Sequence, residues 1–114
     1  MGKFVRGEVV VVPFPFTDLS DVTKRRPALV VANLESDDLI LCMITSQATA
    51  SDKYSLELKS SDFQTGSLDK DSLIRPNRLF TADSKIIVRA AGKLKGDKLT
   101  EVTNRLMEII NGSL

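Results

Sequence analysis

The chain has 114 residues, a net charge of +1, one cysteine and no histidine. A hydrophobic fraction of 42% and a charged fraction of 27% are ordinary for a globular protein, and the length predicts one domain over residues 1–114. The composition excludes Ser-His-Asp and Cys-His catalysis and most zinc sites, because these need imidazoles or several thiols. We expect a cytoplasmic protein without membrane contact, because no apolar run approaches about 20 residues, no secretory signal opens the chain and Cys42 is unpaired.

Short apolar, β-branched runs separated by turn residues predict strands along most of the chain. They lie at Glu8–Val12, Ala28–Ala32, Leu39–Thr45, Tyr54–Leu58, Ser72–Ile74 and Ile86–Ala91. Pro13-Phe14-Pro15 is expected to end the first strand, and a short helix is expected near Ser60–Phe63. Strands of this kind are typical of a small barrel or a sandwich.

The C-terminal segment has a different periodicity. Apolar residues recur there every three or four positions, at Leu99, Val102, Leu106, Ile109 and Ile110. This spacing predicts an amphipathic helix packed on the sheet, with Asp97 as its N-cap and Asn111-Gly112 as its end.

Charge is distributed unevenly although the total is near zero. Residues 33–74 carry three basic and eight acidic side chains, whereas residues 75–95 carry six basic and one acidic. The basic segment is compatible with an anion or nucleic-acid site, and the alternative is the mixed surface of a small domain.

Two short motifs carry side chains suited to phosphate binding. Lys24-Arg25-Arg26 ends a long connection from Pro13 to Pro27, and proline favours an extended conformation for Arg26. The guanidinium group of an arginine so held can bind a phosphate with two donors. Thr45-Ser46-Gln47 follows a predicted buried strand, and its hydroxyls and amide can bind a phosphate or a base edge. The alternatives are a surface arginine and a polar turn.

At these motifs the sequence resembles the MazF/PemK (Kid) toxins of type II toxin–antitoxin modules. The resemblance covers nearly the whole chain and rests on several pieces in family order. These are Arg6-Gly7-Glu8-Val9, Arg26-Pro27-Ala28-Leu29-Val30-Val31, Ile44-Thr45-Ser46-Gln47, Gly66-Ser67-Leu68 with Asp71-Ser72-Leu73-Ile74, and Gly92-Lys93-Leu94.

The resemblance implies a mostly β, SH3-like small barrel with a C-terminal helix, usually a homodimer. It implies a ribosome-independent endoribonuclease that cuts single-stranded RNA at short sequences and leaves 2′,3′-cyclic phosphate and 5′-hydroxyl ends. No metal or cofactor is implied. The implied protein partner is a cognate antitoxin whose tail blocks the RNA groove, and operator DNA is expected only through that antitoxin.

The resemblance also assigns residue roles. The family's catalytic arginine and threonine fall on Arg26 and Thr45. The expected substrate-binding positions are Ser46, Gln47, Asp21, Lys24, Arg25 and Arg78. Arg78 is displaced from the family's usual basic position, and its alternative is a solvated arginine at a strand end. Phe14 and Phe16 are alternatively base-stacking residues or loop anchors.

The chemistry of RNA self-cleavage is consistent with these roles. When a 2′-hydroxyl attacks the adjacent phosphate, the enzyme supplies a proton acceptor, a donor to the leaving oxygen and charge stabilisation at phosphorus. Arg26 suits the last two roles, because a guanidinium group only donates hydrogen bonds and is a poor base. Thr45 can hold a non-bridging oxygen. The acceptor stays open between Asp21, Glu8 and the phosphate itself.

Two other functions stay open at this point. One is a related barrel toxin that binds DNA gyrase without catalysis, against which the pair of Arg26 and Thr45 argues. The other is a catalytically inactive dimer that serves as an interaction module.

Overall fold

The structure is a computed structural model that describes residues 4–14, 24–46 and 53–114. These residues form strands, two short 3₁₀ helices and one α-helix. In chain order the elements are β1 (Glu8–Phe14), β2 (Lys24–Asn33), β3 (Asp38–Thr45), β4 (Leu56–Leu58), η2 (Ser60–Asp62), β5 (Phe63–Gly66), β6 (Ser72–Asp83), η3 (Ser84–Ile86), β7 (Arg89–Leu94) and α1 (Gly96–Ile110).

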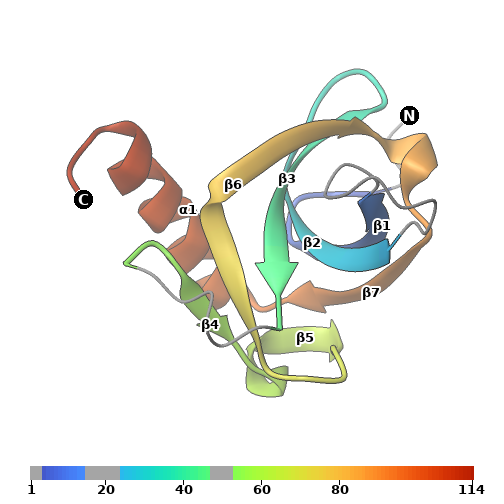
Figure 1. The fold of residues 1–114 in the computed structure, drawn as a ribbon, viewed down its shortest axis with the longest axis horizontal. Helices are drawn as coiled ribbons and strands as arrows, with labels where there is room; N and C mark the ends of the chain where they lie inside the picture. The colour runs from blue at the N-terminus through green and yellow to red at the C-terminus, as the bar shows by residue number, and fades with distance from the viewer. Residues whose placement is uncertain (1–3, 15–23, 47–52) are drawn as a thin grey trace.

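The strands form one antiparallel sheet in the order β4-β6-β3-β2-β1-β7-β5. Figure 1 shows the sheet curling into a half-closed barrel, with α1 packed outside it next to β6 and β4. Register shifts in the β1–β7, β2–β3 and β3–β6 pairs allow this curl, because a bulge bends a strand and increases its twist. The prediction of a mostly β fold with a C-terminal helix is therefore confirmed, in its barrel form.

Two apolar clusters lie on opposite faces of the curled sheet. Side chains alternate along each central strand, so that Val9 belongs to one cluster while Val10 and Val12 belong to the other. The helix-side cluster also contains Val102 and Leu106 of α1. The second cluster lies within the strands and is built from fully or almost fully buried residues, namely Val10, Val12, Ala28, Val30, Leu39 and Leu41.

The first two strands are longer than predicted. Strand β1 continues through Pro13 to Phe14, and β2 begins at Lys24, so that Phe14 pairs with Lys24. Proline is tolerated there because β7 pairs with β1 only as far as Val11, which leaves the far side of Pro13 without a described ladder. Residues 24–26 therefore lie in a strand, and the prediction that they end a loop was wrong.

Strand β6 also continues beyond its predicted end at Ile74. Cys42 pairs with Leu79 and Met43 pairs with Arg75, so that residues 76–78 form a bulge opposite two adjacent residues of β3. The bulge takes Pro76 out of the hydrogen-bonded ladder, which is why a proline is accepted inside a long strand.

The C-terminal elements agree with the prediction except in detail. Strand β7 starts at Arg89 rather than Ile86, because residues 84–86 form η3, which Asp83 caps by accepting a hydrogen bond from the Lys85 amide at 2.8 Å. The N-cap of α1 is Lys95, and Asp97 lies in the first turn, where a carboxylate stabilises the helix dipole. The helix ends before Gly112, whose φ is +74°. No helix of the described residues is long and apolar enough to cross a membrane.

Candidate functional site

Arg26 is held near the start of β2 by its neighbours in the sheet. It pairs with Val12 of β1 and is followed by Pro27, which pairs with Val11. Because side chains alternate along a strand, Arg26 lies on the same face as Ala28, a member of the second cluster. Its Nε is buried and has no hydrogen-bond partner among the residues that the structure describes. A buried donor without a partner costs about 1–3 kcal/mol, so an anion bound to Arg26 would relieve this cost.

Thr45 and Ser46 lie where β3 ends beside the start of β2. Ala28 pairs with Met43. Arg26 precedes Ala28 by two residues and Thr45 follows Met43 by two residues. Because the strands are antiparallel, both steps lead to the same end of the sheet. The β2–β3 register therefore places Thr45 across from Arg26 on the same face. Thr45 is only 6% exposed and pairs with Leu73 of β6, whereas Ser46 is exposed.

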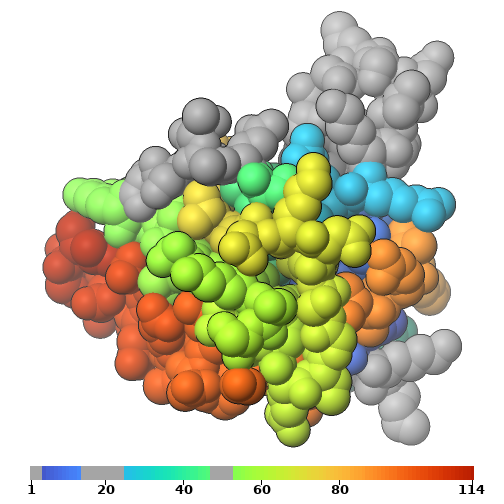
Figure 2. Space-filling model, turned by 90° about the horizontal axis from the view of Figure 1, so that it is seen from below, coloured from blue at the N-terminus to red at the C-terminus, as the bar shows by residue number. Residues whose placement is uncertain are grey.

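A cavity of about 300 Å³ joins Arg26 and Ser46 to a third segment of the chain. Its wall also includes Arg25, Pro27 and the segment before and at the start of β6, represented by Leu68, Asp69, Lys70 and Ser72. Figure 2, a view from below, shows the yellow segment around residue 70 against the blue start of β2. The described lining residues include three cationic side chains and one carboxylate, a charge balance that favours an anion.

The cavity wall at residues 68–72 depends on a close contact between two glycines. Gly66 ends β5 with a φ of +68°, and a Cβ there would meet the Ala91 carbonyl oxygen. A Cβ on Gly92 would lie 2.5 Å from the Thr65 carbonyl oxygen. Only glycines allow β5 and β7 to approach this closely at Gly66 and Gly92. Ser72 then closes the turn, because its hydroxyl donates a hydrogen bond to the Lys70 carbonyl oxygen at 3.0 Å.

The sequence pattern does not predict that the cavity is also lined by Asp69, Lys70 and Ser72. Strand β3 pairs with both β2 and β6, which brings the start of β6 and the residues before it near Arg26. Charge and motif spacing give no sign of this arrangement. The available signal was the pair of glycines at positions 66 and 92, which appeared only as pieces of the family resemblance.

The remaining expected residues are distributed differently. Arg25 lines the cavity, and the backbone of Lys24 pairs with Phe14. Asp21, Gln47 and Phe16 lie outside the described residues. Glu8 is separated from Arg26, because Val12 pairs with Arg26 and lies four residues, about 13 Å, from Glu8 along β1.

The Glu8 carboxylate accepts a hydrogen bond from the Val5 amide at 2.7 Å and so stabilises the turn that precedes β1. Its place at the other end of the strand removes Glu8 as a proton acceptor beside Arg26.

Arg78 lies in the β6 bulge and lines a second cavity of about 430 Å³, together with Met43, Asn77, Leu79 and Phe80. Arg75 lies between the two regions, because it pairs with Met43. The expected RNA-contacting residues are thus divided between two cavities that are linked by β3.

Cys42 is not part of either cavity. It is fully buried in the helix-side cluster, and this burial raises the pKa of its thiol to about 12, opposed by a backbone hydrogen bond at Leu29. A thiol that stays protonated and buried is not a nucleophile at neutral pH.

Comparison with known proteins shows the family to which this chain belongs. Residues 5–110 match the family of PemK-like, MazF-like toxins of type II toxin–antitoxin systems, and the chain therefore belongs to this family. A search among curated proteins found no match.

Solved structures share the fold at low sequence identity. The crystal structure of MazF from Deinococcus radiodurans has a TM-score of 0.72 and 20% identity, with 94% of this chain and 96% of that one covered. An endoribonuclease in complex with its cognate antitoxin, from a mycobacterial species, has a TM-score of 0.68 and 16% identity, with 94% of each chain covered. The toxin MazF-mt6 of Mycobacterium tuberculosis has a TM-score of 0.70 and 11% identity, with 91% and 96% covered.

Proposed function

We propose that this toxin is an endoribonuclease that cleaves single-stranded RNA at short sequences, without a metal ion and independently of the ribosome. The observation that carries the proposal is the cavity at Arg26, where cationic side chains surround a buried guanidinium donor without a described partner. The description of similar structures as endoribonucleases supports the same activity. A gyrase-binding toxin or an inactive module would not need this arrangement.

The proposed reaction uses the RNA's own 2′-hydroxyl as nucleophile. Its oxygen forms a bond to the adjacent phosphorus while the bond to the 5′-oxygen of the next nucleotide breaks, which gives a 2′,3′-cyclic phosphate and a 5′-hydroxyl. Arg26 stabilises the charge that develops on the phosphate and donates to the leaving oxygen. Thr45 and Ser46 hold non-bridging oxygens.

The 2′-hydroxyl must lose its proton during the attack. Asp69 is the one carboxylate among the described residues that line the cavity, so it is the described group best placed to accept this proton. Asp21 and the phosphate itself remain the other acceptors. Arg25 and Lys70 bind the flanking phosphates.

The proposed partners follow from the same family and from the solved complexes. We propose a cytoplasmic homodimer that is inhibited by a cognate antitoxin, which also provides any contact with operator DNA. The mycobacterial endoribonuclease with its antitoxin and the MazE–MazF structures from Deinococcus radiodurans support this assignment.

The test is cleavage of a long single-stranded RNA by the antitoxin-free chain in excess EDTA, with the ends of the products mapped. Wild type is expected to give discrete cuts with cyclic-phosphate ends, and Arg26→Ala is expected to give none. Arg89→Ala is the matched control, because Arg89 is an exposed arginine of β7 that does not line the cavity. Uncut RNA with wild type, or full activity in Arg26→Ala, would contradict the proposal, and a supercoiling assay would then test gyrase binding.

A further inference from the structure

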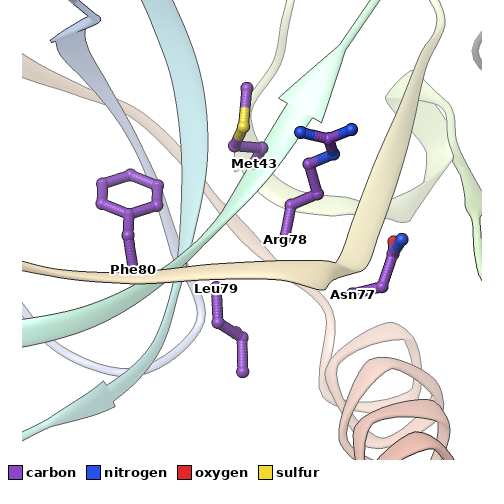
Figure 3. Close-up of a pocket in the computed structure, with 5 residues that line it drawn as sticks. All are labelled: Met43, Asn77, Arg78, Leu79 and Phe80. Atoms are coloured by element: carbon purple, nitrogen blue, oxygen red, sulfur yellow. The ribbon is translucent and has the colours of Figure 1, made fainter. Parts of the chain in front are cut away.

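The second cavity, formed at the bulge of β6, has a composition unlike that of the first. Figure 3 shows Met43, Arg78 and Phe80 on the inner side of the bend in β6, whereas Leu79 and Asn77 lie on its outer side. Met43 and Phe80 are half-buried against the second cluster, and Arg78 is exposed. The cavity thus has a wall made of a flat ring and a thioether, with a cation beside it.

This cavity continues the face that carries Arg26 and Thr45. Met43 precedes Thr45 by two residues on β3 and pairs with Ala28, which follows Arg26 by two residues on β2. Two residues of a strand span about 6.5 Å, so the cavity begins within one nucleotide of a phosphate bound at Arg26.

The side chains of this cavity match the chemistry of a nucleobase. Unpaired bases of single-stranded RNA stack on aromatic rings and on guanidinium planes, and the polarizable sulfur of methionine also packs favourably against rings. Arg78 makes no hydrogen bond or ion pair with any residue in the described part of the chain, so its donors are available to a ligand. A guanidinium only donates hydrogen bonds, which favours a base edge with carbonyl oxygens.

We propose that the cavity formed by Met43, Arg78 and Phe80 binds the base of a nucleotide adjacent to the cleaved phosphate and prefers guanine or uracil. The proposal rests on the proposed function, because it places the phosphate at Arg26. Phe80 supplies the stacking surface, and Arg78 reads the carbonyl oxygens of the base. Arg78 lies on the same side as Phe80 because side chains two residues apart on a strand share a face.

Binding measurements test this subsite separately from cleavage. The probe is a short oligoribonucleotide selected for binding to the wild-type chain, made with 2′-O-methyl riboses so that it cannot be cut. Each base in turn is replaced by an abasic position. With wild type, one abasic position in particular is expected to weaken binding about 10-fold or more.

In the Phe80→Leu variant, the same abasic position is expected to change the RNA binding affinity very little. Leucine keeps an apolar side chain at this place but has no flat ring on which a base could stack. Leu34→Ala is the matched control, because Leu34 is 42% exposed in the turn between β2 and β3, at the other end of these strands. The Leu34→Ala variant is expected to show the same loss of binding at that abasic position as wild type. If no position loses its effect in Phe80→Leu, the subsite does not exist.

Arg78→Gln tests the preference for carbonyl oxygens without touching a buried side chain. At the position identified with Phe80→Leu, wild type is expected to bind guanine or uracil several-fold better than adenine, and Arg78→Gln is expected to lose this difference. An unchanged preference would overturn the role of Arg78. A change in sedimentation of Phe80→Leu with unchanged RNA binding would show a protein contact at this cavity and overturn the proposal.

Failure of this inference is distinguishable from failure of the proposed function. Cleavage that depends on Arg26 without any base position coupled to Phe80 would leave the ribonuclease proposal intact and overturn only the subsite. Absence of cleavage by wild type would overturn the ribonuclease proposal, whereas the binding measurement would still decide whether the cavity takes a base.

Discussion

Arg26 of β2 and Ser46, the residue after β3, line one cavity. They are brought together because β2 and β3 are antiparallel neighbours, so the start of one strand lies beside the end of the other. Pro27 has no amide hydrogen to donate, and the ladder between the two strands begins at the next residue, Ala28. The absence of ladder bonds at this end leaves room for a ligand between the two strand ends.

Thr45 provides a test of how much the threonine hydroxyl contributes to cleavage compared with the guanidinium group of Arg26. Thr45→Val keeps the shape of a side chain that is only 6% exposed and removes the hydroxyl. RNA cleavage is expected to fall by roughly 10- to 100-fold, because one positioning hydroxyl is lost while the guanidinium group of Arg26 stays. Thr45→Ser is expected to retain most activity. A loss in Thr45→Val equal to that in Arg26→Ala would reverse this ranking.

Lys70 is expected to contact RNA phosphates, which salt dependence can measure. In Lys70→Gln the slope of log affinity against log salt concentration should become shallower by about 0.7, the value for one phosphate contact on a single strand. Lys59→Gln is the matched control, because Lys59 lies outside the cavity with its Nζ 3.9 Å from a Glu57 carboxylate oxygen. Equal slopes for wild type and Lys70→Gln would remove Lys70 from the RNA contact surface.

Two glycine substitutions are expected to have opposite effects on stability, one in the contact between β5 and β7 and one in α1. Gly92→Ala would place a Cβ 2.5 Å from the Thr65 carbonyl oxygen and is expected to lower the free energy of unfolding by about 1–3 kcal/mol. A Cβ on Gly96, in the first turn of α1, would lie in open space among the described residues. Gly96→Ala is expected to raise the free energy of unfolding by about 0.4–1 kcal/mol. Urea unfolding of both variants measures the difference, and a neutral Gly92→Ala would show that the strands separate easily.

The buried thiol of Cys42 is expected to lower the free energy of unfolding at alkaline pH. Burial raises the pKa of its thiol from 9.0 to about 12 in the folded chain, so the folded state keeps a proton that the unfolded state loses. The resulting stabilisation is complete below pH 9 and is lost as the pH rises from about 9 to about 12. Unfolding free energies of wild type should therefore fall more steeply over this range than those of Cys42→Ala. Parallel curves for the two proteins would contradict this account.

The thiol of Cys42 also gives a test at neutral pH. A thiol reagent is expected to leave the folded chain unmodified and to react once urea unfolds it, because Cys42 is fully buried. Rapid modification of the folded chain would show that the helix-side cluster opens without unfolding.

The local pattern of the sequence was sufficient for the elements that follow one clear period. The apolar runs around Val9, Leu29 and Leu41 predicted the three central strands, and the spacing from Leu99 to Ile110 predicted α1. Strand ends were less well predicted at Pro13 and Pro76. A proline ends a strand only where a partner strand needs its amide hydrogen, and that depends on pairing and bulges that the sequence does not display.

Composition and short motifs define the chemical character of this protein. Without histidine and with a single cysteine it has few choices of catalytic group, and the motifs at Arg26 and Thr45 named the family to which the chain belongs. Which groups share a cavity depends instead on the folded arrangement of the strands. Asp69 and Lys70 join Arg26, Glu8 does not, and Arg78 lines a cavity of its own. The reason is physical, because strand register and the glycine contact at Gly66 and Gly92 set these distances, and both arise from long-range packing rather than from neighbouring residues.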